Sequence, residues 1–146
     1  MLKSLMLLLG AVLSGAATSP PPSSPRYAAG QIWEYRHRPQ DVASLLKIRK
    51  VEDGGKLGVI YHITIVGLVL RNPAAGSALH HAPVSQQTLD ASVTRLGQSA
   101  IAWPDVEPGI AQWRQDNGGV FTIPVAQIVQ IIDDQTAALL SPSVTS

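Results

Sequence analysis

The chain has 146 residues, 11 of them basic and 10 acidic, with a net charge of +1 and no cysteine. Without cysteine it can form no disulfide, no thiolate ligand to a metal and no cysteine-linked lipid anchor. The even charge balance gives no electrostatic basis for binding nucleic acid or a strongly anionic membrane surface.

The N-terminal residues 1–17 have the pattern of a cleavable secretory signal peptide. Lys3 supplies the basic start, residues 5–13 form the apolar middle, and residues 14–17 are small, as a signal peptidase requires. A membrane-spanning helix needs about 20 apolar residues, which this run does not reach. We expect cleavage, with a retained anchor and a buried N-terminal helix as alternatives. A flexible linker rich in Pro and Ser follows over residues 18–29.

Two strands and a hairpin turn are predicted at the start of the folded domain. Residues 31–37 alternate so that Trp33 and Tyr35 share one face, which is typical of a half-buried strand. A second strand is predicted over residues 45–51. The sequence Asp-Gly-Gly at positions 53–55 favours a hairpin turn, since glycine adopts positive φ without steric cost.

The next segment, residues 58–70, is rich in β-branched residues but too long for one typical strand. Gly67 is expected to divide it into a third strand over residues 59–65 and a fourth over residues 68–71. Val66 is a poor partner for a tight turn, because a β-branched residue resists positive φ. One long strand with a kink at the glycine is therefore the alternative.

A loop over residues 72–84 and three helices are predicted to complete the domain. Ser85 is expected to cap a helix over residues 86–96, which carries an apolar stripe. A second helix is expected over residues 106–115, and a third begins after Thr122, its predicted N-cap. The third helix has an apolar face formed by Val125, Ile128, Val129 and Ile132.

The order of strands first and helices second predicts an α+β domain over residues 30–140. We expect an N-terminal antiparallel meander of three to four strands packed against about three C-terminal helices, which cover one face of the sheet. Residues 141–146 are expected to form a disordered tail.

Histidines are the best candidates for chemistry, because imidazole can bind zinc or transfer protons near neutral pH. His80 and His81 are adjacent, so their side chains should diverge, and no acidic residue lies between Asp53 and Asp90. We therefore expect no metal site, no catalytic residues and no cofactor. The four histidines are His37, His62, His80 and His81.

Four residues are predicted to contact a ligand or partner: His80, His81, Trp103 and His62. His80 and His81 lie in the predicted loop, and Trp103 lies in a second loop beside Pro104. Long loops without secondary structure are often functional. His62 should instead share the exposed face of its strand with Thr64 as a cross-strand polar pair.

Several segments resemble the landmarks of a group of small exported bacterial proteins to which no activity is attached. They are residues 30–36 (GQIWEYR), 71–73 (RNP), 81–85 (HAPVS), 89–94 (LDASVT) and 119–125 (GVFTIPV). The group has an Asp-Gly hairpin where this chain has Val66 and Gly67. The resemblance therefore does not decide whether the predicted fourth strand forms in this chain. The resemblance implies a bacterial exported protein and assigns no functional residues.

The sequence predicts an exported, periplasmic or secreted, non-enzymatic domain that binds an extracytoplasmic protein or a small ligand. After cleavage of the signal peptide we expect no contact with a membrane and none with nucleic acid. A periplasmic inhibitor or immunity-type protein is one alternative. A metal-dependent or histidine-dependent hydrolase that uses His62, His80 and His81 is the other.

Overall fold

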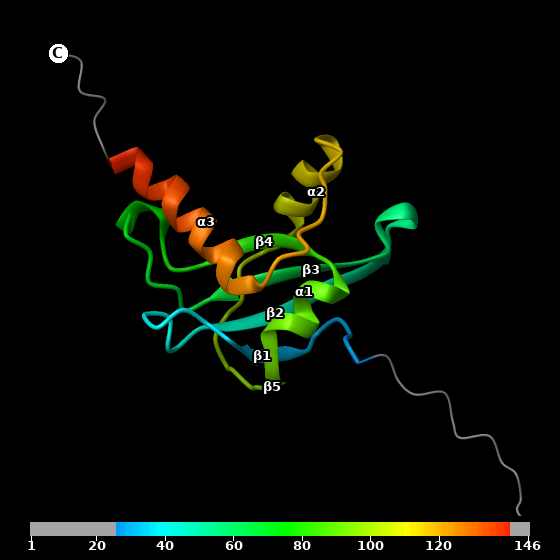
Figure 1. Ribbon diagram of the computed structural model, residues 1–146, viewed down its shortest axis with the longest axis horizontal. Helices are drawn as coiled ribbons and strands as arrows, with labels where there is room; N and C mark the ends of the chain where they lie inside the picture. The colour runs from blue at the N-terminus through cyan, green and yellow to red at the C-terminus, as the bar shows by residue number, and fades with distance from the viewer. Residues whose placement is uncertain (1–25, 141–146) are drawn as a thin grey trace, which may run out of the picture.

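The structure is a computed structural model that describes residues 26–140. The predicted signal peptide 1–17, residues 18–25 of the linker and the tail 141–146 lie outside the described residues. The described part is an α+β domain with a five-stranded antiparallel sheet, in the order β4-β3-β2-β1-β5, and three α-helices (Figure 1). No helix within residues 26–140 is long and apolar enough to cross a membrane.

Along the chain, four strands come first, and a fifth strand then lies between the first and second of the three α-helices. The strands are β1 (Ile32–Tyr35), β2 (Leu45–Asp53), β3 (Val59–Val66), β4 (Leu79–Val84) and β5 (Val93–Leu96). The α-helices are α1 (Gln86–Ser92), α2 (Glu107–Gln115) and α3 (Val125–Ala137). Three short 3₁₀ turns are η2 (Gly55–Leu57), η3 (Pro73–Ala75) and η4 (Ala138–Leu140).

The first three strands form the expected antiparallel meander. β1 pairs with β2, and β2 pairs with β3 over eight residue pairs, from Leu45 opposite Val66 to Asp53 opposite Val59. The connection between β2 and β3 contains η2 at the predicted Asp-Gly-Gly turn. Trp33 and Tyr35 are both buried, as their alternation predicts.

One face of the sheet, called here the α3 face, carries the main apolar core. Alternate residues of β3, Tyr61, Ile63 and Ile65, point to this face and pack with α1 and α3. The helices contribute Leu89, Val125, Ile128 and Val129 to the same buried cluster. The apolar face predicted for the third helix is confirmed at these last three positions.

The opposite face, called here the α2 face, is also covered, which corrects the expectation that helices cover one face only. Ile60 and His62 alternate with Tyr61 and therefore point to this side. Trp113 of α2 packs edge-on against His62, with ring centroids 5.0 Å apart. Ile110 of the same helix is buried. In Figure 1, α2 lies apart from α1 and α3.

The prediction of a fourth strand over residues 68–71 is wrong. Gly67 has φ of 71°, and a Cβ there would lie 2.6 Å from the carbonyl oxygen of Ala43, so the chain leaves the sheet at this point. The fourth strand is β4, inside the predicted loop. Pro83 argues against a strand in the sequence, because proline has no N–H to donate. β4 is an edge strand, however, where that missing N–H is tolerated.

The prediction of one helix over residues 86–96 is also wrong. Ser85 does cap α1, accepting a hydrogen bond from the backbone N–H of Thr88 at 3.2 Å. The helix then ends at Ser92, and Val93 to Leu96 form β5. β5 pairs with β1 at the far edge of the sheet, so the strand order is not strictly sequential. Two consecutive β-branched residues, Val93 and Thr94, favour the strand.

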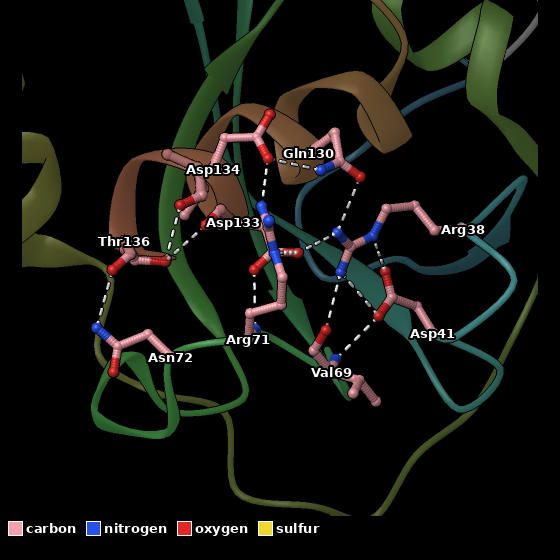
Figure 2. A network of polar contacts seen from close by, with 10 residues as sticks. Arg38, Asp41, Val69, Arg71, Asn72, Gln130, Asp133, Asp134 and Thr136 are labelled. Carbon is pink, nitrogen blue, oxygen red and sulfur yellow. Dashed lines mark hydrogen bonds and ion pairs between the residues drawn. The ribbon is translucent and has the colours of Figure 1, made fainter. Parts of the chain in front are cut away.

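A buried ion-pair network holds the chain after β3 in place (Figure 2). Arg38 donates to Asp41 at 2.7 Å and to Asp133 of α3 at 2.8 Å, and all three side chains are almost fully buried. The backbone N–H of Arg71 donates to Asp133, and the carbonyl of Val69 accepts from Arg38. These side chains satisfy the backbone groups of residues 69–71 that a strand partner would otherwise bind.

The N-terminal part of the described chain also belongs to the packed structure. Tyr27 falls within the segment 18–29 that the sequence assigns to a linker, yet only 3% of it is exposed. Its ring makes edge-on contacts with Trp33 and Tyr61, with centroids 5.7 and 5.6 Å apart. Packed residues therefore begin before Gly30.

Candidate functional site

Two of the predicted site residues, His62 and His81, meet on the α2 face and form a chain of hydrogen bonds with a carboxylate. His62 on β3 lies between Glu52 on β2 and His81 on β4. Its Nε2 is 2.5 Å from Glu52 Oε1, and its Nδ1 is 2.9 Å from His81 Nε2. The two imidazole rings stack, with centroids 5.1 Å apart.

Helix α2 closes over this histidine chain. Gly109 fits directly above His81, since a Cβ at position 109 would lie 2.5 Å from the His81 Cβ. Trp113 contacts His62, and Arg114 donates to both carboxylate oxygens of Glu52 at 3.0 and 3.2 Å. His62 is 0% exposed, which contradicts its predicted position on an open face.

Burial keeps both imidazoles neutral. Burial is the main cause that lowers the pKa of His62, although Glu52 opposes it. Burial, reinforced by the neighbouring His62, lowers the pKa of His81 from 6.5 to about 4. The pKa of Glu52 is raised by its own burial, but hydrogen bonds from His62 and Arg114 outweigh this and leave it below its usual value.

These protonation states fix the direction of every hydrogen bond in the chain. An ionised Glu52 can only accept, so the proton of neutral His62 is on Nε2. The bare Nδ1 of His62 then accepts from the Nε2–H of His81, whose Nδ1 is left as an acceptor beneath α2. The chain therefore has the order of a proton relay, with the buried His62 between two partly exposed ends, Glu52 and His81.

The neighbours of the histidine chain bear on the hydrolase alternative. A nucleophile and base must lie within hydrogen-bonding distance of one another. Within residues 26–140 no hydroxyl group bonds to either imidazole, and the nearby hydroxyl of Thr64 donates to the carbonyl of His80. In the same range no group of three or more His, Asp or Glu side chains is placed to hold a metal ion.

The other two predicted site residues lie apart from this chain. The side chain of His80 is exposed, whereas that of its neighbour His81 is partly enclosed beneath α2, so the two diverge as expected. Trp103 packs against the sheet near Lys47, whose Nζ is 5.5 Å from the ring centroid. The indole N–H of Trp103 has no hydrogen-bond partner among residues 26–140.

A second feature, which the sequence did not indicate, is an apolar hollow of about 540 Å³ at the outer end of the sheet. We call it the tyrosine hollow. It is lined by Tyr27, Ala28, Ala29, Arg49, Lys50, Val51, Val59 and Tyr61. Val51 lies opposite Tyr61 in the β2–β3 ladder and Val59 lies two residues before it, so these side chains share the α3 face.

The tyrosine hollow exists because the β2–β3 hairpin extends beyond the helices that cover the rest of the α3 face (Figure 1). Val51 is 37% exposed and Val59 is 42% exposed, whereas Ile63 and Ile65, further along β3, are fully buried. An apolar depression rimmed by polar groups is typical of a binding surface on a small domain.

Hydrogen bonds fix the wall of the tyrosine hollow. The hydroxyl of Tyr27 donates to Asp90 of α1 at 2.6 Å, and Arg26 lies over the Tyr27 ring. Burial is the main cause that raises the pKa of Tyr27, and the Asp90 carboxylate adds to it, so the phenol stays protonated. Gln31 holds the backbone of Ala28 through its side-chain oxygen at 3.0 Å.

The edge of β2 beside the tyrosine hollow is open. β1 pairs with β2 only at Leu46 and Lys47, and the last backbone bond on that side joins Gly30 N–H to the Ile48 carbonyl. Beyond it, residues 50–53 pair with β3 but have no described strand on their other side. An unpaired strand edge offers a row of backbone donors and acceptors.

A further hollow of about 500 Å³ lies between the β2–β3 turn and the end of α2. Its lining includes Glu52, Trp113 and Arg114. These three side chains already bind the histidine chain or one another. Of these two hollows, the tyrosine hollow is therefore the one whose apolar lining is left open.

Family models, curated proteins and solved structures all give no match to this chain. Function is therefore inferred from the geometry of the described residues alone.

Proposed function

We propose that this chain is an exported, non-enzymatic domain that binds an extracytoplasmic protein through the tyrosine hollow. The observation that carries the proposal is the apolar lining of that hollow, where Val51 and Val59 are exposed beside a fixed tyrosine wall. Val51 and Val59 are only about 40% exposed, so covering their remaining surface against a partner would contribute about 0.5–1 kcal/mol each to a binding free energy.

The histidine chain is assigned a structural role in this proposal. His62 is enclosed, and its two ring nitrogens already have partners. A ligand would have to displace α2 before it could reach the buried imidazole of His62. The hydrolase alternative has no supporting hydroxyl or metal-binding group near these residues, within the part of the chain that the structure describes.

Affinity capture with matched variants tests the binding surface. The mature protein is immobilised and exposed to a periplasmic extract of the producing cells. Val59→Asp should lose the captured protein, whereas Val42→Asp should retain it, because Val42 is 76% exposed in a loop away from the hollow. A captured protein that both variants retain would contradict the proposal, as would a capture lost from both variants while both stay folded.

The identity of the captured protein also separates the alternatives. Loss of that partner's activity on binding would make the domain an inhibitor or immunity-type protein. Unchanged activity would leave a carrier or adaptor role.

The proposed export is tested by sequencing the N-terminus of the protein isolated from cells. We expect a mature chain that begins just after residues 14–17, in the periplasm or the medium. A chain that retains Met1 would contradict the proposed cleavage.

A further inference from the structure

We propose that the partner binds as an extended peptide strand that adds to the open edge of β2 and inserts apolar side chains into the tyrosine hollow. This inference rests on the proposed function, because it specifies how the same surface recognises its partner. The juxtaposition that carries it is the unpaired edge at residues 50–53 directly beside the apolar hollow.

The open edge supplies the main-chain part of such an interface. Strand addition obtains affinity from backbone hydrogen bonds and specificity from pockets for alternate side chains. Residues 50–53 are held in extended geometry by β3, so the edge is already formed before a partner arrives. Segment 26–29 lines the hollow, but its backbone bonds go to Gln31 and not to this edge.

The side chains around the edge predict the sequence of the added strand. Every second side chain of that strand would point to the α3 face, where the hollow accepts an apolar group. The side chain between them would point to the α2 face, beside Lys50, which lies opposite His62. Lys50 forms no ion pair within residues 26–140. The expected motif is therefore apolar–acidic–apolar.

The segment of this chain that precedes Arg26 does not suit the edge. It contains Pro20, Pro21, Pro22 and Pro25. Proline cannot donate to a ladder, so a stretch this rich in proline makes a poor added strand. The occupant is therefore assigned to another protein.

Selection from a library tests the inference with a defined probe. Random 12-residue peptides displayed on phage are selected against the mature protein, and the enriched peptide is then synthesised. We expect the apolar–acidic–apolar motif and new hydrogen-exchange protection at the amides of residues 50–53. Methylating one edge-facing peptide nitrogen should weaken binding about tenfold, the equivalent of one hydrogen bond. Lys50→Glu should change the selected central residue from acidic to basic, whereas Lys56→Glu in the exposed turn should not.

The outcomes separate this inference from the proposed function. A peptide that loses binding with Val59→Asp but leaves residues 50–53 unprotected contradicts strand addition and retains the hollow as the binding surface. A library that yields no peptide dependent on Val59 contradicts both. Some amides of residues 50–53 already bond to β3, so the informative amides are those that face the open edge. Protection of these edge-facing amides before any peptide is added means that this chain or a second copy fills the edge. That result also contradicts the inference. Protection that increases with protein concentration indicates a second copy, and protection that does not change with concentration indicates a segment of the same chain.

Discussion

The histidine chain makes the stability of the domain depend on pH in a window that can be calculated. His81 has a pKa of about 4 in the folded protein and 6.5 when unfolded, so between these values the unfolded chain binds more protons. Stability is therefore present above pH 6.5 and is lost as the pH falls towards 4. His62 acts in the same direction, because its pKa is also lowered.

The magnitude follows from the two pKa values. Between pH 7 and pH 5 the unfolded chain takes up a proton at His81 that the folded protein does not bind, which lowers the free energy of unfolding by about 2 kcal/mol, as 1.36 kcal/mol corresponds to one pKa unit. The folded protein does not bind this proton because a charged His81 would lose its hydration beneath α2 and would lie against the ring of His62. Glu52 acts in the same direction as the pH falls further, because burial raises its pKa but His62 and Arg114 lower it more, so its pKa in the folded protein is also lowered.

Urea unfolding at pH 7 and pH 5, at one ionic strength, measures this difference. His81→Gln keeps a donor towards His62 but cannot titrate, so it should remove about 2 kcal/mol of the pH dependence. His80→Gln is the matched control, since its ring is exposed and forms no hydrogen bond within the described chain. If His81→Gln shows the same pH dependence as the unaltered protein, the account of the buried histidines is wrong.

Two further predictions concern the rest of the scaffold. Arg38→Ala should lower the free energy of unfolding by about 3–5 kcal/mol, because it leaves two buried carboxylates without their partner. Arg71→Ala should lower it far less, because the Arg71 side chain is 55% exposed and water can replace it. Equal losses in urea titrations of the two variants would argue against the network in Figure 2. Gly109→Ala should destabilise the domain, because about 1–3 kcal/mol of overpacking against His81 exceeds the roughly 1 kcal/mol of added helix propensity. Gly119→Ala meets nothing within 4 Å and should change the unfolding midpoint little, so a larger effect there than at position 109 would refute this packing argument.

The local patterns in the sequence were sufficient for the first three strands and for the existence of the second and third helices, although the third helix has Pro124 at its N-cap and not the predicted Thr122. Alternation at Trp33 and Tyr35 gave the buried face of β1, and the Asp-Gly-Gly turn gave the β2–β3 connection. The helical spacing of Val125, Ile128 and Val129 gave the packed face of α3. In each case the residues that form the pattern lie within one element and pack against the same core.

The errors arose where distant residues decide the conformation. Residues 68–71 leave the sheet because Arg38 and two carboxylates from elsewhere in the chain bind their backbone. The apolar spacing of Leu89, Val93 and Leu96 fits a helix, yet Val93 is in a strand that β1 recruits at the far edge. The local sequence identifies neither set of partners, although the β-branched Val93 and Thr94 do favour a strand.

The candidate site was visible only in part for the same reason. The sequence supplied His62 and His81, but their contact depends on the order β4-β3-β2, and β4 had been predicted as a loop. Glu52 is ten residues before His62, and the two residues do not form a recognisable sequence motif. The tyrosine hollow could not be predicted because the sequence assigns Tyr27 to a linker. The short sequence distance between Tyr27 and Trp33 was nevertheless a usable indication of aromatic packing.

Chemical-shift mapping by NMR tests the central claim most directly. The mature, isotope-labelled protein is titrated with the peptide selected from the phage library. We predict that the largest shift changes fall on residues 27–29 and 50–53 and on Val59 and Tyr61, and that α2 and His80 stay unchanged. Changes centred on His80, on Trp103 or on α2, with the tyrosine hollow unaffected, would contradict the account.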